Sequence, residues 1–144
     1  MYLGQHHLFV DSDRHLIIPE PIRKIFVDGA YITRGFEDDL IMMSDKVFQE
    51  IYQRVVALNM ADPLARLLLR LILGNASRID MNNSGHIHIP ENLMSFAGLE
   101  KEIVLVGQGD YIELWSPPNW EKQSAILLDI AANSERFSHL NLAL

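Results

Sequence analysis

The feature that most constrains the fold of this chain is an internal repeat. The hexapeptide HLIIPE at residues 15–20 returns as HIHIPE at residues 86–91, a spacing of 71 positions (86 − 15). After one inserted residue, Leu40 and Met42 correspond to Ile112 and Leu114. Apolar residues keep this phase over roughly forty positions, which predicts two copies of one structural unit.

Each copy shows the same order of expected elements. A strand runs into a polar turn and returns as a short strand, and a proline then opens a short helix before two more strands and a longer helix. The expected strands are 5–10, 15–19, 30–34 and 40–44 in the first copy and 75–81, 86–90, 102–108 and 111–116 in the second. Pro19 and Pro90 are expected at the first helical position, and Gly29 and Gly98 at a positive φ after the short helices.

Three longer helices are predicted. Asp45 is a suitable N-cap for a helix over residues 45–58. A helix at about 62–73 is apolar nearly all round, so we expect it to be buried between the copies or at a subunit contact. The C-terminal helix from about 118 has Trp120, Leu127 and Ala131 on one face, and the loss of the pattern after Asn133 predicts a loose tail.

The expected fold class is therefore α+β, with two duplicated β units and short helices forming one pseudo-two-fold domain. The divisions follow the repeat. They are a first unit at 1–60, a linker helix at 61–74, a second unit at 75–131 and a C-terminal tail at 132–144.

Composition narrows the class of protein. The net charge of −7 argues against indiscriminate binding to nucleic acid, so any such contact has to be local. The chain has no cysteine, which favours a reducing cytoplasm and excludes thiolate chemistry. The N-terminus lacks the pattern of a signal peptide, and the apolar stretch 67–73 is too short to span a membrane.

The sequence does not predict an enzyme. No nucleophile motif, glycine-rich phosphate loop or pair of carboxylates recurs in both copies, and no cofactor or small-molecule substrate is expected. The acidic run Glu37, Asp38 and Asp39 is expected to be a solvated hairpin tip rather than a site.

His86 and His88 raise the question of a metal site, because residues two apart on a strand point to the same face. The first copy has Ile17 where His88 stands, so only His15 and His86 are shared by the copies. The favoured interpretation is that His88 is a half-exposed strand residue and that no metal is bound; a metal pair is the weaker alternative.

Several segments together resemble the MraZ family of bacterial transcriptional regulators, which is related to AbrB-like swapped-hairpin DNA-binding domains. They are MYLGQHHLFVDSDRHLIIPEPIRK, YITRGFEDDL, DPLARLLLRLILGNAS and GLEKEIVLVGQGDYIELW. The resemblance implies a tandem AbrB-like protein that forms a homo-oligomeric ring and docks its turns on repeated elements of double-stranded promoter DNA. It also implies regulation of division and cell-wall genes in the cytoplasm, at the nucleoid.

The family signature is an Asp-x-x-Gly-Arg turn in each copy, whose arginine is the implied DNA contact. Here both arginine positions hold histidine, and the remaining signature positions match only in part. The DNA-binding residues that the resemblance implies are Asp11, Arg14, His15, Asn82, Gly85 and His86, and Arg78 is a further candidate. Arg14 stands where the family has glycine, which predicts a first turn of different shape.

The two histidines leave a second function open. Neutral imidazole carries no charge, and each lost phosphate contact weakens the salt dependence of DNA binding. With a net charge of −7, the alternative is a degenerate relative that assembles but acts as a scaffold or interaction protein.

Overall fold

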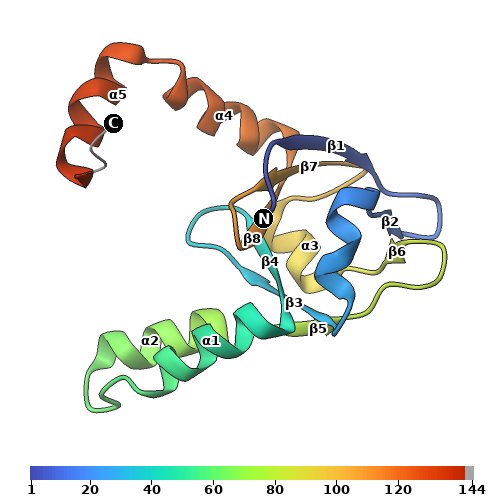
Figure 1. The fold of residues 1–144 in the computed structure, drawn as a ribbon, viewed down its shortest axis with the longest axis horizontal. Coiled ribbons are helices and arrows are strands. Elements are labelled where there is room, and N and C mark those ends of the chain that lie inside the picture. The colour runs from blue at the N-terminus through green and yellow to red at the C-terminus, as the bar shows by residue number, and fades with distance from the viewer. Residues whose placement is uncertain (142–144) are drawn as a thin grey trace.

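The computed structural model describes residues 1–141 and is a mixed α+β structure built on an antiparallel sheet, which confirms the expected class (Figure 1). The first half of the chain contains β1 (Gln5–Phe9), β2 (Leu16–Ile17), the 3-10 helix η1 (Glu20–Phe26), β3 (Ala30–Arg34), β4 (Leu40–Ser44) and α1 (Asp45–Val56). After α2 (Pro63–Ile72), the second half contains β5 (Ser77–Ile79), β6 (His86–Ile87), α3 (Glu91–Ala97), β7 (Glu102–Gly107), β8 (Tyr111–Trp115) and α4 (Pro117–Leu127). The chain continues through α5 (Ile130–Phe137) and the 3-10 helix η2 (Ser138–Leu140).

The main sheet interleaves the two halves of the chain. Its order is β1-β7-β8-β4-β3-β5, so the first strand of each half pairs with the β-hairpin of the other half. At its centre, Leu40 pairs with Leu114 and Met42 pairs with Ile112, and all four side chains are fully buried. Because these apolar side chains come from both halves, the halves share one core.

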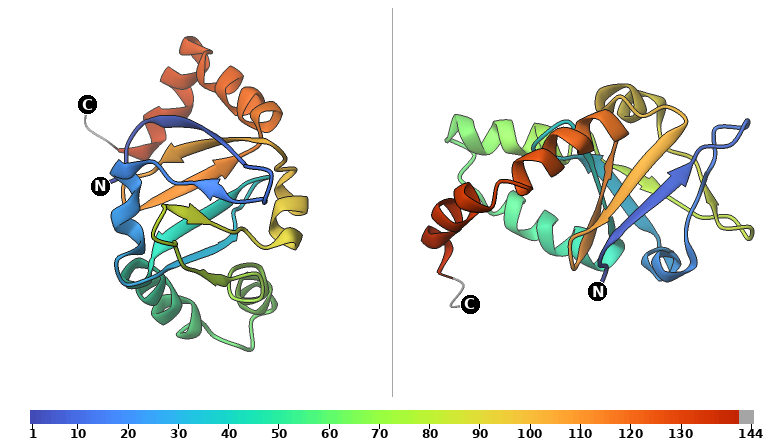
Figure 2. Two further views of the ribbon diagram at one scale, coloured as in Figure 1. Left: turned by 90° about the vertical axis from the view of Figure 1, so that its right-hand side faces the viewer. Right: turned by 90° about the horizontal axis from the view of Figure 1, so that it is seen from above.

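A second, two-stranded ribbon joins the halves again. β2 and β6 pair in antiparallel fashion, with Leu16 opposite Ile87, and both side chains are buried. The connections that precede these strands, β1–β2 and β5–β6, therefore lie side by side at one end of the molecule (Figures 1 and 2). The long helices extend from the other end, as Figure 2 also shows.

The short helices begin one residue later than expected. Pro19 and Pro90 are the N-cap residues of η1 and α3, because their ψ angles of 144° and 137° continue the extended backbone of β2 and β6. Gly29 and Gly98 have φ angles of +90° and +64°, which confirms the expected positive φ after each helix.

The N-cap of α1 is Ser44 and not the expected Asp45. The Ser44 hydroxyl, at the end of β4, accepts a hydrogen bond from the amide of Val47 at 3.3 Å. A hydroxyl at this position satisfies an amide that the helix leaves without a partner, so Asp45 becomes the first helical residue and favours the positive end of the dipole.

Helix α2 is only partly buried within the chain. Ala65 and Ile72 are buried, but Leu64 and Leu67 are 72% and 60% exposed. The expectation that this helix is buried between the two copies is therefore wrong, because α2 packs mainly along α1 in a helical hairpin that extends away from the sheet (Figure 1).

The C-terminal region is more helical than expected. The predicted tail at 132–144 is wrong for its first part, because Asp129 caps α5 by accepting a hydrogen bond from Ala132 and the helix continues to Phe137. An apolar pattern is missing there because α5 has no buried residue. Residues 142–144 of that predicted tail lie outside the described residues, and no helix among residues 1–141 is long and apolar enough to cross a membrane.

Asp39 is not part of a solvated tip as expected. It is 3% exposed and accepts a hydrogen bond from the amide of Glu37, while Glu113 of the neighbouring strand β8 faces it. Burial, together with the adjacent Asp39 carboxyl, raises the pKa of Glu113 to about 7. The two carboxyls therefore form a titratable pair inside the fold, remote in sequence from the turns.

Candidate nucleic-acid interface

The first turn, residues 11–15, and the second turn, residues 82–86, have the same backbone hydrogen bonds. In the first turn the amide of Asp11 donates to the carbonyl of His15 at 2.9 Å, and the amide of Arg14 donates to the carbonyl of Asp11 at 3.1 Å. In the second turn Asn82 donates to His86 at 3.0 Å, and Gly85 donates to Asn82 at 3.1 Å. The polar stretches that the sequence pairs therefore adopt one conformation.

One side-chain oxygen at the start of each turn closes it. Asp11 Oδ1 accepts from the amides of Asp13 and His15 at 2.9 and 2.8 Å. Asn82 Oδ1 accepts from the amides of Ser84 and His86 at 3.0 and 2.9 Å. Asp11 and Asn82 therefore have the same structural role, since each side chain offers an oxygen that accepts hydrogen bonds.

The two starting residues differ in charge. The hydrogen bond from the amide of His15 lowers the pKa of Asp11, and the nearby histidine rings lower it further. Turn 1 therefore carries a stable negative charge that turn 2 lacks.

The expected difference in shape is absent, because Arg14 adopts the glycine conformation. Its φ is +61°, against +78° for Gly85 at the corresponding position of turn 2. A side chain in the left-handed region costs about 1 kcal/mol. Turn 1 therefore keeps the shape of turn 2 at some cost in stability.

The histidines that end the turns meet across the β2–β6 ribbon. The rings of His15 and His86 are stacked, with centroids 5.9 Å apart and an interplanar angle of 20°. His88 approaches His15 edge-on at 6.1 Å. His15 and His86 are partly exposed and His88 is exposed, so the three imidazoles form a cluster that solvent reaches.

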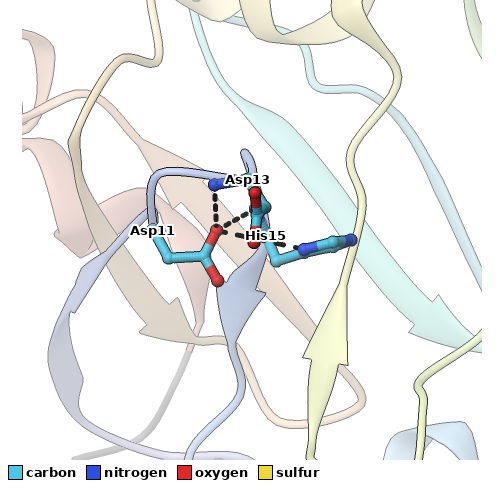
Figure 3. A group of neighbouring side chains, drawn as sticks. All are labelled: Asp11, Asp13 and His15. Carbon is cyan, nitrogen blue, oxygen red and sulfur yellow. Dashed lines mark hydrogen bonds and ion pairs between the residues drawn. The ribbon is translucent and has the colours of Figure 1, made fainter.

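Asp11, Asp13 and His15 also come together within turn 1 (Figure 3). Their ligand atoms all lie within 4.8 Å of one another, including 3.9 Å between Asp11 Oδ1 and His15 Nδ1. The same Asp11 oxygen already accepts two backbone amides, as Figure 3 shows, so the closure of the turn accounts for this grouping.

The two arginines named from the sequence have different surroundings. Arg14 projects from turn 1 and its Nη1 lies 3.3 Å from Oε1 of Glu91. Arg78 contacts Gly29, Tyr31 and Asp80, none of which belongs to a turn.

Arg23 was missed by the sequence reasoning. It lies directly against Gly85 of turn 2, although 62 positions separate the two residues (85 − 23). The repeat could have drawn attention to this residue, because the two copies differ there: the second copy has Met94 at the position that corresponds to Arg23.

Comparisons with known proteins place the chain in a family. A profile of the MraZ protein family matches residues 72–139. The transcriptional regulator MraZ of Thermomicrobium roseum is 33% identical over 127 residues, 88% of this chain and 89% of that protein. The namesake from Herpetosiphon aurantiacus is 34% identical over 84% of this chain and 85% of its own length, and that from Clostridium tetani is 28% identical over 99% of this chain and 100% of its own. With a third of its residues shared over most of both lengths, the chain belongs to the MraZ family.

Proposed function

We propose that this chain is a sequence-specific DNA-binding transcriptional regulator that acts as a ring-shaped homo-oligomer. The observation that carries the proposal is the presentation of one turn geometry twice, at one end of the molecule, with His15 and His86 5.9 Å apart. The relatives are named transcriptional regulators, and the family resemblance points to promoter DNA of a division and cell-wall gene cluster, in the cytoplasm at the nucleoid.

In this proposal, residues 1–60 and 75–131 are tandem AbrB-like swapped-hairpin units and residues 61–74 join them. The strand pairing supports it. Leu16 lies opposite Ile87 and Ile41 opposite Glu113, and each pair joins equivalent positions of the repeat. We infer that a pseudo-two-fold axis relates the halves, as exchanged hairpins would require.

Assembly is the second part of the proposal. Apolar side chains are exposed on α2, where Leu64 and Leu67 face solvent, and on the C-terminal helices, where Leu128 and Ile130 are 78% and 82% exposed. Exposed apolar surface of this kind is typical of subunit contacts. Both regions lie away from the turns, so a ring closed through them leaves the turns accessible to DNA (Figure 1).

The ring compensates for weak individual contacts. Neutral imidazoles contribute little to phosphate binding, and the overall charge of −7 opposes an approach to DNA. Several turns that engage repeated elements at once raise the effective concentration of each further contact. We therefore expect binding only to DNA with suitably spaced elements.

A mobility-shift titration with the duplex upstream of the protein's own gene tests this function. We expect a shift that weakens steeply with salt and is absent with a duplex of shuffled sequence. A ring-sized elution volume without any salt-sensitive shift would favour the scaffold alternative.

The assembly can be tested separately. The double variant Leu64→Glu/Leu67→Glu should elute as smaller species and bind the duplex more weakly, because it places charge in the subunit contact. Val27→Glu is a matched control, since Val27 is also exposed but lies outside α1, α2, α4 and α5. Unchanged elution of the double variant would contradict the proposed contact.

A further inference from the structure

Each turn lies against the short helix of the other half of the chain. Arg23, on η1, covers Gly85 of turn 2 so closely that a Cβ added there would lie 2.5 Å from Nη2 and 2.6 Å from Cζ. Nε of Arg23 donates a hydrogen bond to the carbonyl oxygen of Ile18 at 2.9 Å. The amide of Ile18 in turn donates to the carbonyl oxygen of Gly85 at 2.9 Å. The guanidinium is therefore anchored through Nε against the face of the turn.

The terminal nitrogens of Arg23 are the part that a ligand can use. Among residues 1–141, Arg23 takes part in no ion pair, and its side chain is partly exposed. A guanidinium held by Nε keeps its outer N–H groups in a fixed fork, which matches the oxygens of a phosphate.

In turn 1 the arginine is in the turn, and the helix packed against it has no arginine at the corresponding position. Arg14 stands at the glycine position of the turn, and α3 carries Met94 where η1 carries Arg23. Arg14, Glu91 and Met94 line one cleft of about 750 Å³ between turn 1 and α3. Each turn thus has one arginine, contributed by the turn itself in one case and by the helix packed against it in the other.

We propose that Arg14 and Arg23 are a matched pair of DNA-phosphate-binding residues, one for each turn, with Arg23 acting on turn 2 from the other half of the chain. This inference rests on the proposed DNA binding. Turn 2 combines Gly85 with Arg23 on η1, and turn 1 combines Arg14 with Met94 on α3, so each turn has one permanent positive charge. His15 and His86, in contrast, are charged only when protonated. The two arginines replace the fixed charge that the histidine substitutions remove.

The first experiment measures the salt dependence of binding to the duplex upstream of the protein's own gene, by fluorescence anisotropy. Arg23→Met should lower the slope of log K against log salt by about one for each engaged protomer, and the affinity about tenfold. Lys24→Met is the matched control, because it removes the same charge from an exposed neighbour on η1 and should leave the slope close to that of the unchanged protein.

A second variant distinguishes a phosphate contact from a structural role. Arg23→Met/Gly85→Arg gives turn 2 the distribution of turn 1, and without the Arg23 guanidinium there is room for the new side chain. We expect it to restore the salt slope that Arg23→Met loses. Thermal unfolding and elution volume, measured for each variant, establish that fold and assembly are retained.

The outcomes separate this inference from the function on which it rests. If the unchanged protein binds the duplex and Arg23→Met has the same slope as Lys24→Met, the role of Arg23 is refuted and the DNA-binding function stands. If the double variant does not recover the slope, the proposal that Arg14 and Arg23 have equivalent roles is also refuted. No salt-sensitive binding by the unchanged protein overturns both.

Discussion

The two turns have one backbone conformation but different chemistry. Both begin with an oxygen that accepts two amides and both place their fourth residue at positive φ. They differ at those same positions, where turn 1 has Asp11 and Arg14 and turn 2 has Asn82 and Gly85. The conformation therefore requires a hydrogen-bond acceptor at the first residue and a positive φ at the fourth. The positive charge can stand within the turn or be supplied by a neighbouring helix.

The largest expected effect comes from adding a side chain to turn 2. Gly85→Ala combines a positive φ with a Cβ that meets the Arg23 guanidinium, and it should lower the free energy of unfolding by about 2 kcal/mol. Arg14→Ala keeps a non-glycine residue at positive φ in both proteins, so it should change stability by less than about 0.5 kcal/mol. Chemical denaturation at equal protein concentration measures both. Equal losses would mean that the contact between Gly85 and the Arg23 guanidinium does not limit the side chain at this position.

The next effect comes from the carboxyl pair of buried Asp39 and partly buried Glu113. Glu113 has a raised pKa of about 7 in the folded protein, so its protonated form stabilises the fold. This contribution is complete below the ordinary pKa of a glutamate and is lost as the pH rises towards and through 7.

Glu113→Gln should therefore reduce the decline in stability between about pH 4.5 and 7 and leave the protein more stable at pH 8, by about 1 kcal/mol. Thermal unfolding across this range provides the measurement. A decline of the same size in the variant would show that Glu113 is not responsible.

The sequence predicted the sheet better than it predicted the surroundings of the turns. Strands 30–34 and 40–44 were predicted to the residue because glycine or aspartate borders each of them at both ends. The repeat also predicted that the turns would match. Contacts between the halves were beyond this reasoning, because Arg23 meets Gly85 and Asp39 meets Glu113 only after the strands interleave.

Helix α2 shows a different limit of prediction. An apolar helix pattern indicates that a surface will be covered, but it does not identify the covering partner. Leu64 and Leu67 were expected to be buried, and within one chain they are exposed. The phase of the pattern is the same whether a helix packs on its own core or on another subunit.

A smaller effect should follow from making the first residues of the turns alike. The lowered pKa of Asp11 means that its ionised form stabilises the fold. That stability is present above the ordinary pKa of an aspartate and is lost as the pH falls through the lower folded-state value. Asp11→Asn should reduce this acid sensitivity, and Asn82→Asp should add a similar sensitivity to turn 2. Thermal unfolding below pH 5 tests both, and a change of the same sign in the two variants would contradict the equivalence of the turns.

The smallest expected effect concerns the ion pair of Arg14. Glu91→Gln should strengthen DNA binding a few-fold, because Arg14 no longer shares its guanidinium with a carboxylate that lies 3.3 Å away. Glu20 is the equivalent residue of the first half, and turn 2 has Gly85 at the position of Arg14, so Glu20→Gln is the matched control. Affinities are measured by fluorescence anisotropy. Equal gains from the two variants would mean that only the change in net charge matters, and not the ion pair with Arg14.

In the proposed complex, the paired histidines of the two turns face DNA. The groups near the rings are Asp11, Asp13 and His88, and Arg14 precedes His15 in the chain. The most direct test is the affinity for the upstream duplex between pH 8 and 6, the range in which imidazole gains a proton. The account predicts that affinity rises as the pH falls, in the Glu113→Gln background as well, and that His15→Ala/His86→Ala abolishes the rise. A flat profile, or the same rise in the double variant, would contradict it.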